Sequence, residues 1–269
     1  MTGKILIVIQ ARRGSTRLPD KIFLPLAGKP LIYRMIERVK SAKTCSEIVV
    51  ATTTDKDDDK VEAFCKENEI KCFRGHPTDL LDRHYKAAKE FKADIVVKIP
   101  SDCPLICPDV IDRVLNYYLS NSGKFDFVSN LHPSTYPDGN DVEVMPVEIL
   151  ETAFKEATHD FEREHTTPFI WERPERFRIG NVEWETGLNF SMSHRFTIDY
   201  PEDYEFIKRV YDELFDKKKI FKLSDIMMLL DKKPEIKSIN AKYAGVNWYR
   251  NHLDKLKTIT VKETRNINH

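Results

Sequence analysis

The first half of the chain alternates short apolar runs with segments that have the periodicity of amphipathic helices. KILIVIQ (4–10), EIVVATT (47–53) and ADIVVKIP (93–100) are nearly continuous apolar runs of strand length. The segment 108–121 instead repeats its apolar residues at intervals of three and four, as one face of a helix does. Buried strands that alternate with helices are typical of a parallel sheet covered on both faces. The sequence therefore predicts an α/β fold, in which ligands bind beyond the carboxyl ends of the strands.

The second half of the chain is less regular but continues the alternation. Strands are expected at FDFVSN (125–130), VEVMP (142–146), RFRIGNVE (176–183) and HRFTID (194–199). Helices are expected at 146–157, 160–174, 201–215 and 222–236. We divide the chain into one domain over residues 1–235 and a C-terminal tail, 236–269, which is docked or partly disordered.

Bulk composition excludes several classes of protein. Lys plus Arg and Asp plus Glu are both 43, so the formal net charge is zero, which argues against a general nucleic-acid binder. No apolar run reaches the roughly 18 residues of a membrane span. The five cysteines are odd in number and contain no C-x-x-C pair, which indicates reduced thiols in a cytoplasmic protein.

Four cations nevertheless gather within ten residues directly after the first expected strand. Gly, Ser and Thr in the same loop offer backbone N–H and hydroxyl donors, and Arg and Lys form charge-assisted bonds to phosphate oxygens. The loop is neither a P-loop nor a dinucleotide fingerprint, because both glycine patterns are missing. From the residues alone, an anion site and an ordinary solvated connection are equally supported. The residues concerned are Arg12, Arg13, Gly14, Ser15, Thr16, Arg17 and Lys21, with Asp20 as the one acid.

Two aspartates follow apolar strands in the same way. Asp102 comes after the run at 93–100, and Asp199 comes after RFTI. Two strand-end carboxylates beside a polyphosphate suit Mg²⁺, which takes oxygen ligands and is usually held by one or two carboxylates plus phosphates. The alternative is that each aspartate caps the helix that follows it.

The cationic loop, read as IQARRGSTRLPDKIFLPLAGKPLI, resembles the signature of the cytidylyltransferases that make CMP-activated sugars. These include the CMP-Kdo and CMP-acylneuraminate synthetases and, closest to this sequence, the spore-coat polysaccharide biosynthesis branch. The resemblance covers about residues 4–215 and includes, in the family's order, PTDLLDRHYKAA, IPSDCPLICP, YPDGNDVEVM, REHTTPFI and RFTIDYPEDYEFI. It implies a three-layer α/β/α, Rossmann-like, mixed and mostly parallel sheet of the nucleotide-diphospho-sugar transferase type.

The resemblance also implies roles for individual residues. The reaction would be Mg²⁺-dependent transfer of a nucleoside monophosphate from CTP to a sugar, sugar acid or phosphorylated acceptor, with release of pyrophosphate. Catalytic roles fall to Arg12, Lys21 and Asp102, and Asp102 and Asp199 would hold the metal. Nucleotide binding is assigned to Ala11, Arg12, Gly14, Ser15, Arg17, Lys21, Thr53, Asp79, Asp82 and Ser101. The acceptor side is assigned to Asn130, Tyr136, Asp141, Glu143, Arg163 and His165.

Some of these assignments have structural alternatives. Asp79 is equally well explained as an acid at a helix N-terminus, and a lone histidine such as His165 is more often structural. The family commonly has Gly where this chain has Asp20, and an apolar or small residue where it has Arg13.

Two other functions remain open at this point. A nucleotide-sugar-dependent glycosyltransferase would share the type of sheet, although such enzymes usually hold their metal through D-x-D, and this chain has SDCP. A nucleotide-binding regulatory protein without turnover is the non-enzymatic alternative. The expected partners are CTP and a small sugar-like acceptor, with no nucleic acid and no membrane, and family members commonly form homodimers.

Overall fold

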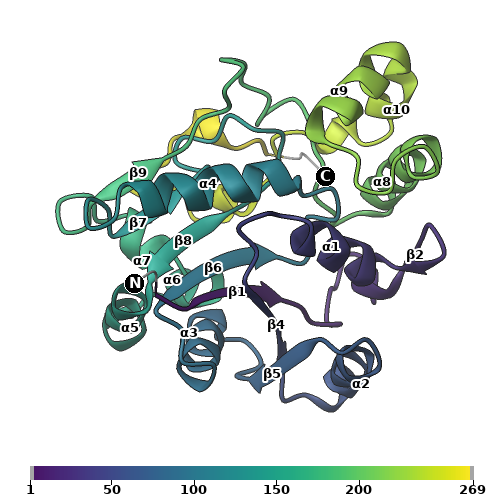
Figure 1. Cartoon of the computed structure of the whole chain (residues 1–269). Coiled ribbons are helices and arrows are strands. Elements are labelled where there is room, and N and C mark those ends of the chain that lie inside the picture. Colours follow the sequence, from purple (N-terminus) through teal and green to yellow (C-terminus); the bar gives the residue numbers. More distant parts are fainter. Residues whose placement is uncertain (1–2, 267–269) are drawn as a thin grey trace.

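The computed structural model of the chain describes residues 3–266 (Figure 1). Its centre is a seven-stranded sheet in which the strands lie in the order β5-β4-β1-β6-β8-β7-β9. These strands are β1 (Ile5–Gln10), β4 (Glu47–Thr53), β5 (Lys71–Gly75), β6 (Ile95–Pro100), β7 (Phe127–Ser129), β8 (Glu143–Pro146) and β9 (Ile179–Asn181). A small separate ribbon pairs β2 (Pro25–Leu26) with β3 (Lys29–Pro30). Within the large sheet β8 is antiparallel to β6 and β7, whereas the other pairs are parallel.

Helices cover both faces of this sheet. They are α1 (Leu31–Lys40), α2 (Asp59–Glu67), α3 (Leu80–Glu90), α4 (Pro108–Ser120), α5 (Val147–Glu156), α6 (Asp160–His165), α7 (Pro168–Trp171), α8 (Pro201–Leu214), α9 (Leu223–Lys232) and α10 (Pro234–Ser238). Short 3₁₀ turns lie at Lys21–Phe23, Lys56–Asp58, Ala241–Tyr243, Trp248–Asn251 and Val261–Glu263. None of the helices among residues 3–266 is long and apolar enough to cross a membrane.

Side-chain alternation along the strands divides the core into two layers. In β1, Ile7 and Ile9 pack into a cluster that also receives α1, α2, α4, α8 and α9. Leu6 and Val8 point to the opposite face, where α3, α5, α6 and α7 complete a second cluster. This three-layer α/β/α arrangement, with a mixed and mostly parallel sheet, confirms the predicted fold class.

The strand order reverses beside β1. From β1 the chain proceeds outward to β4 and β5, and it then returns to place β6 on the other side of β1. In open α/β sheets such a switch point opens a crevice beyond the carboxyl ends of the strands, and ligands bind there. The loops after β1 and β6, residues 11–24 and 101–107, border this crevice.

Three secondary-structure predictions were wrong, and one of them, the single helix expected at 222–236, is divided into α9 and α10 at Lys233. The segment 194–199 is not a strand, and within it only an isolated bridge joins Arg195 to Asp138. The backbone N–H groups of Phe196 and Ile198 bond to the carbonyl oxygens of Asp138 and Asp102, at 2.7 and 2.9 Å, so loops take the place of a neighbouring strand. The helix expected at 160–174 is broken at Thr166, which has a φ of 75°, just before Pro168 starts α7.

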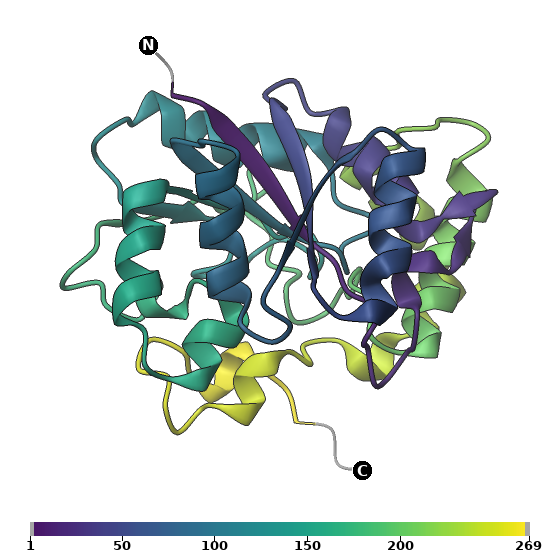
Figure 2. The same ribbon diagram turned by 90° about the horizontal axis from the view of Figure 1, so that it is seen from below.

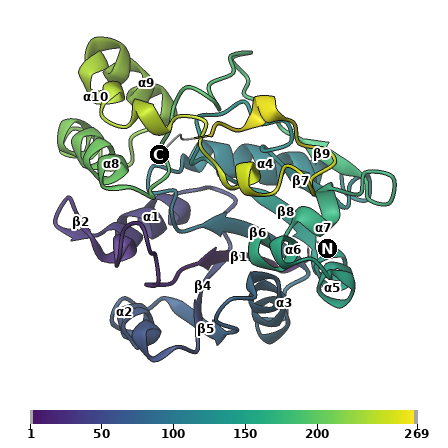
Figure 3. The ribbon, with the colours of Figure 1, turned by 180° about the vertical axis from the view of Figure 1, so that it is seen from behind.

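The C-terminal segment packs against the domain. In Figure 2 the C-terminal segment (yellow) lies below the sheet, on the side toward which β1 runs from the N-terminus. Seen from behind (Figure 3), the segment lies beside α6 and α7, and Trp248 stacks on His165 with ring centroids 3.8 Å apart. Leu256 and Ile259 are buried in the second core cluster. The division at residue 235 stays a prediction, and residues 267–269 lie outside the described part of the chain.

Candidate active site

The candidate site forms where the carboxyl ends of β1, β4 and β6 meet. Because β8 is antiparallel, its first residue, Glu143, pairs with Lys98 near the end of β6 and brings the loop before β8 to the same edge. Asp102 accepts hydrogen bonds through its backbone carbonyl from Ile198 N–H (2.9 Å) and the Thr197 hydroxyl (3.0 Å). These bonds bring the segment that carries Asp199 next to the loop that carries Asp102.

Lys21 lies between the two predicted metal-binding carboxylates. Its Nζ is 3.0 Å from Asp199 Oδ1 and 3.7 Å from Asp102 Oδ2, and it also donates to the carbonyl oxygen of Ile198 at 2.7 Å. Arg17 reaches the same Asp199 oxygen at 2.8 Å. The structure thus brings together four residues that the sequence placed in the site: Arg17, Lys21, Asp102 and Asp199.

Arg13 and Asp20, the two residues that depart from the family pattern, bind each other. Arg13 Nε and Nη2 donate to the two Asp20 oxygens at 2.5 and 2.8 Å, a bidentate ion pair across the loop. Asp20 has a φ of 55°, in the left-handed region that glycine adopts without steric cost and aspartate tolerates. Arg13 also donates its backbone N–H to Asp58 at 2.8 Å. This bond and the ion pair between Arg13 and Asp20 together hold the loop in place.

Arg12 is an exposed residue of the same loop. Its side chain is exposed and forms no hydrogen bond or ion pair within residues 3–266. Burial, together with the charge of Arg12, lowers the pKa of Arg83 to about 10. Gly14 is exposed and a Cβ there would meet no atom within 4 Å, while Ser15 Oγ accepts from Leu18 N–H at 3.3 Å. Arg12 is therefore free to bind an external anion.

The residues predicted for the nucleotide on β4, α3 and β6 are largely bonded within the protein. The buried Thr53 hydroxyl donates to Asp58. Asp79 caps α3 by accepting from Asp82 N–H at 2.9 Å, and its other oxygen pairs with Arg163 Nε at 2.5 Å. Asp82 itself pairs with Lys86 at 2.7 Å. The backbone N–H groups of Ala11 and Ser101 bond to Ala51 and Gln10, as expected of loop residues that directly follow strands.

Two residues predicted for the acceptor have mainly internal contacts. Asn130 uses both ends of its amide, donating to the Asn140 carbonyl (2.8 Å) and accepting from Val142 N–H (3.0 Å), and so closes the loop before β8. Tyr136 is buried and stacks on Trp184 with ring centroids 5.9 Å apart. Their role in acceptor binding stays a prediction.

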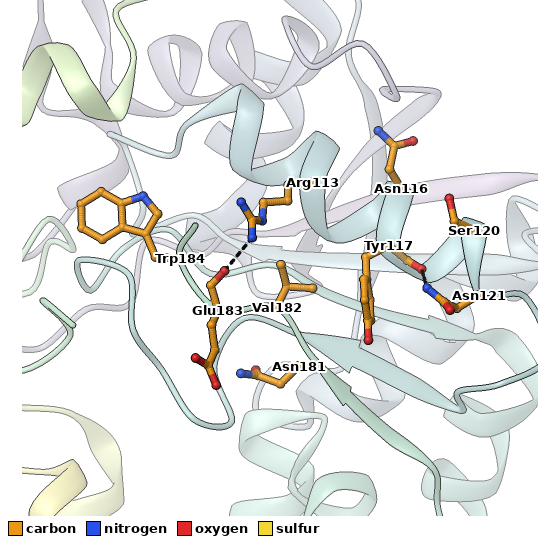
Figure 4. Close-up of a pocket in the computed structure, with 9 residues that line it drawn as sticks. All are labelled: Arg113, Asn116, Tyr117, Ser120, Asn121, Asn181, Val182, Glu183 and Trp184. Carbon is orange, nitrogen blue, oxygen red and sulfur yellow. Dashed lines mark hydrogen bonds between the residues drawn. The ribbon is translucent and has the colours of Figure 1, made fainter. Parts of the chain in front are cut away.

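Trp184 lines a groove of about 630 Å³ between α4 and residues 181–184 (Figure 4). The lining residues are Arg113, Asn116, Tyr117, Ser120, Asn121, Asn181, Val182, Glu183 and Trp184. None of these lining residues is a predicted site residue.

The aspartates around Asp102 have pKa values that are shifted in different directions. Burial, with the charges of Asp102 and Glu143, raises the pKa of Asp141 to about 7. Burial also raises the pKa of Asp138 well above its usual range, although Arg195 opposes this. Burial would raise the pKa of Asp199 too, but Lys21, Arg17 and Arg195 outweigh it and lower the value to about 2. Asp199 is therefore ionised at neutral pH, whereas burial favours the protonated form of Asp138.

Comparison with known proteins identifies the family. The family model described as "Cytidylyltransferase" matches residues 6–230. The solved structure of a cytidylyltransferase from Leptospira borgpetersenii is 36% identical, with a TM-score of 0.81 over 87% of this chain and 96% of that one. The chain belongs to the cytidylyltransferase family.

Two further relatives agree with this family. The spore coat polysaccharide biosynthesis protein SpsF of Bacillus subtilis is 29% identical over 236 residues, which are 86% of this chain and 95% of that protein. The structure of a CMP:2-keto-3-deoxy-manno-octonic acid synthetase complexed with CTP covers 78% of this chain and 99% of that one, with a TM-score of 0.60. At 20% identity it supports the fold alone. The family match over residues 6–230 confirms the prediction of a nucleotidyltransferase enzyme.

In this cytidylyltransferase several residues at the site were not singled out from the sequence. Lys98 forms a buried ion pair with Glu143 at 2.6 Å, and Thr167 donates to the other Glu143 oxygen at 3.0 Å. A lone lysine in the otherwise apolar run at 95–100 was the available signal. Burial and the charge of Lys98 lower the pKa of His165 to about 3, so this histidine is neutral at pH 7.

A glycine in the loop before β8 allows the close approach of the Asp199 segment. Gly139 has a φ of 104°, and a Cβ there would lie 2.6 Å from the Phe196 carbonyl carbon and 2.7 Å from Thr197 N. We expect Gly139→Ala to lower the free energy of unfolding by about 2–4 kcal/mol, because strain and a backbone clash add. Urea unfolding followed by circular dichroism measures this.

Gly123→Ala is the matched control, since Gly123 also has a positive φ (77°) but open space around it. Gly123→Ala should lower the free energy of unfolding only by the cost of a positive φ, about 1 kcal/mol. Equal losses in the two variants would contradict the close packing of this loop against residues 196–197.

Proposed function

We propose that the chain is a Mg²⁺-dependent cytidylyltransferase that transfers CMP from CTP to a sugar-like acceptor and releases pyrophosphate. The observation that carries the proposal is the arrangement of Lys21 between Asp102 and Asp199, in the loop after β1 that also carries the exposed Arg12. Membership of the cytidylyltransferase family supports CTP as the nucleotide.

Nucleotidyl transfer requires the protein to position the two substrates and to neutralise negative charge. It does not require a covalent intermediate on a side chain. An acceptor oxygen attacks the α-phosphorus of CTP in line, the bond to the β-phosphate oxygen breaks, and pyrophosphate leaves. Negative charge grows on the transferring phosphoryl and on the leaving group. Arg12, Arg17 and Lys21 are the cations on the loop that would neutralise it.

The carboxylates fit a hard divalent cation. Asp102 and Asp199 keep 34% and 22% of their side-chain surface exposed, and both approach the same point, the Lys21 ammonium. Within residues 3–266 no group of three or more His, Cys, Asp or Glu side chains is arranged to hold a metal ion. Mg²⁺ does not need such a group, because one or two carboxylates with substrate phosphates and water suffice. When bound, the ion would polarise phosphate oxygens and add positive charge where the leaving group forms.

The acceptor is proposed to lie on the side of the loop before β8, near Asp141, Glu143 and the Lys98 ammonium. Carboxylates, an ammonium and a hydroxyl at this edge suit a polyhydroxylated, sugar-like molecule. The Bacillus subtilis relative is named for spore coat polysaccharide biosynthesis, which supports a product used in surface polysaccharide or glycan synthesis. A cytoplasmic homodimer is part of the proposal, and light scattering of the purified protein measures the oligomeric state.

A pyrophosphate-release screen tests this function. The four ribonucleoside triphosphates are each combined with Mg²⁺ and a panel of keto-sugar acids, amino sugars and phosphorylated alcohols. We expect pyrophosphate with CTP and one class of acceptor, together with the CMP conjugate by mass spectrometry. Hydrolysis of UDP- or GDP-sugars without pyrophosphate would favour a glycosyltransferase. CTP binding by calorimetry without turnover for any acceptor would favour a regulatory protein.

A further inference from the structure

Arg195 connects Asp199 to a fully buried aspartate. Its Nε and Nη2 donate to Asp203 Oδ1 and Oδ2 at 2.9 and 3.1 Å, and Nη2 also reaches Asp199 Oδ2 at 3.1 Å. The Arg195 side chain is 1% exposed and that of Asp203 is 0% exposed. One guanidinium therefore sets the position of the Asp199 carboxylate relative to the start of α8.

Asp203 fixes the backbone at the same place. Its Oδ2 accepts the N–H groups of Asp199 and Tyr200, at 2.9 and 3.0 Å. The backbone of Asp199 is thus held by Asp203, and its side chain is held in part by Arg195. A change in the position of this buried pair would therefore change the position of the Asp199 carboxylate relative to Lys21.

Residues 240–246, which lie beyond the end of the family match at residue 230, complete the bonding of this pair. Asn240 Nδ2 donates to the Arg195 carbonyl and to Asp203 Oδ1, both at 2.9 Å, and the Val246 carbonyl accepts from Arg195 Nη1 at 2.7 Å. Tyr243 stacks on Tyr200 with ring centroids 3.9 Å apart and the planes 5° from parallel. The segment therefore contacts residues on both sides of Asp199.

The contacts made by residues 240–246 supply hydrogen-bond partners to the buried ion pair of Arg195 and Asp203. A buried ion pair keeps its geometry only when its remaining donors and acceptors have partners, because each unpartnered polar group in the interior carries a desolvation penalty. Arg195 Nη1 also donates to Asp138 Oδ2 at 3.4 Å, so one guanidinium contacts the carboxyl groups of Asp138, Asp199 and Asp203 at the same time. Asn240 and Val246 are the partners that favour the observed orientation toward Asp203 and Asp199.

We propose that the segment 240–246 is part of the active site, where Asn240 and Val246 position Asp199 through Arg195. Arg195, Asn240 and Asp203 are positioning residues, since none of them touches the expected path of the reacting phosphate. The inference rests on the proposed function for its catalytic consequence, but the coupling between Asn240 and Asp199 is a property of the fold and can be measured by itself.

Asn240→Ala in the full-length chain tests the proposal. We expect kcat for pyrophosphate release to fall by roughly ten- to a hundredfold, because small displacements of a catalytic group have such effects, while KM for CTP changes by less than about threefold. Amide hydrogen exchange followed by NMR gives a readout without substrate. Exchange at the Asp199 and Tyr200 amides should accelerate by at least about tenfold, since these amides bond to Asp203.

Glu172→Gln is the matched control. Glu172 holds the other end of the tail by accepting from Lys257 N–H at 2.5 Å and from Thr258 N–H at 2.9 Å, and it lies outside the candidate site. It should lower the melting temperature without changing kcat or the exchange of the Asp199 amide. If Asn240→Ala fails to fold, Tyr243→Ala, which removes the stacking on Tyr200, provides the same comparison.

Several outcomes would overturn the proposal. One is an Asn240→Ala protein with unchanged kcat and unchanged exchange at Asp199 and Tyr200. Another is a loss of kcat that Glu172→Gln reproduces at an equal drop in melting temperature, because the tail would then contribute stability only. If the wild-type chain releases no pyrophosphate from any nucleotide, the proposed function fails, and the exchange measurement alone decides whether Asn240 is coupled to Asp199.

Discussion

Replacing Asp102 with asparagine should abolish measurable CTP-dependent pyrophosphate release and leave the fold intact. We expect the rate to fall by about 10³-fold or more, since a carboxylate that binds a catalytic cation is worth several kcal/mol of transition-state stabilisation. The fold should persist because Asp102 holds residues 197 and 198 through its backbone carbonyl, which the substitution keeps. Among residues 3–266 the Asp102 carboxylate has only long contacts, 3.7 Å to Lys21 and 3.7 Å to Cys103.

The same substitution should not destabilise the protein at neutral pH. The charge of Asp102 is one cause of the raised pKa values of Asp138 and Asp141, so its removal relieves repulsion among buried carboxylates. We expect an unchanged or higher melting temperature at pH 7.5. Loss of activity without loss of stability is common when a residue serves activity rather than stability. Thermal unfolding and the pyrophosphate assay on one preparation measure both effects.

The surface ion pair Lys208–Asp212, 2.6 Å long and remote from the site, supplies the control. Asp212→Asn removes one carboxylate of similar exposure and should change neither rate nor melting temperature, because exposed pairs contribute little. Pyrophosphate release by Asp102→Asn within about threefold of the wild type would contradict the assignment of this carboxylate.

The fold was predictable because its strands and helices are coded locally. Apolar runs such as 4–10 and 93–100 became β1 and β6, and helical spacing at 108–121 became α4. The segment 194–199 was misread because its apolar residues alternate as in a strand, while its hydrogen-bond partners come from loops about 60 and 95 residues earlier in the chain. Periodicity reports which side chains are buried, but it does not report which backbone groups pair.

The sequence predicted only part of the candidate site, because local patterns do not show which distant residues pair with one another. Arg12, Lys21, Asp102 and Asp199 lie in motifs next to strand ends, where the topology of the sheet brings them together. Arg195 and Asp203 were missed, since a buried ion pair between two residues of a charged segment looks the same in sequence as a solvated one. Their hydrogen-bond partners include Asn240 and Val246, and no local sequence pattern predicts that these two residues lie nearby.

Lys21→Met is the second substitution for which we expect a large effect, in this case on activity and on stability. Activity should fall by about 10²- to 10³-fold, the usual consequence of removing a donor aimed at developing charge. Stability should fall as well, because the ammonium bonds to the Ile198 carbonyl at 2.7 Å and to Asp199 at 3.0 Å. A partly buried carboxylate that loses a charged partner typically costs about 1–3 kcal/mol.

The pH dependence of that loss distinguishes the Asp199 contact from general damage. The stabilisation from Asp199 is fully present above its unfolded pKa of about 3.9 and is lost as the pH falls through the folded value of about 2. Removing Lys21 raises the folded pKa, so the difference in free energy of unfolding between variant and wild type should be largest near pH 7 and should shrink as the pH falls below about 4. Urea unfolding at pH 7 and at pH 3 measures the two differences.

Lys208→Met, the other half of the remote surface pair, is the control for the Lys21 experiment. It should alter the free energy of unfolding by less than about 0.5 kcal/mol at either pH and leave pyrophosphate release unchanged. A Lys21→Met loss that is the same at pH 7 and pH 3 would mean that the Asp199 charge is not what the ammonium stabilises. In that case the bond to the Ile198 carbonyl, which does not titrate, would account for the stability, and the lowered pKa of Asp199 would have to come from Arg17 and Arg195.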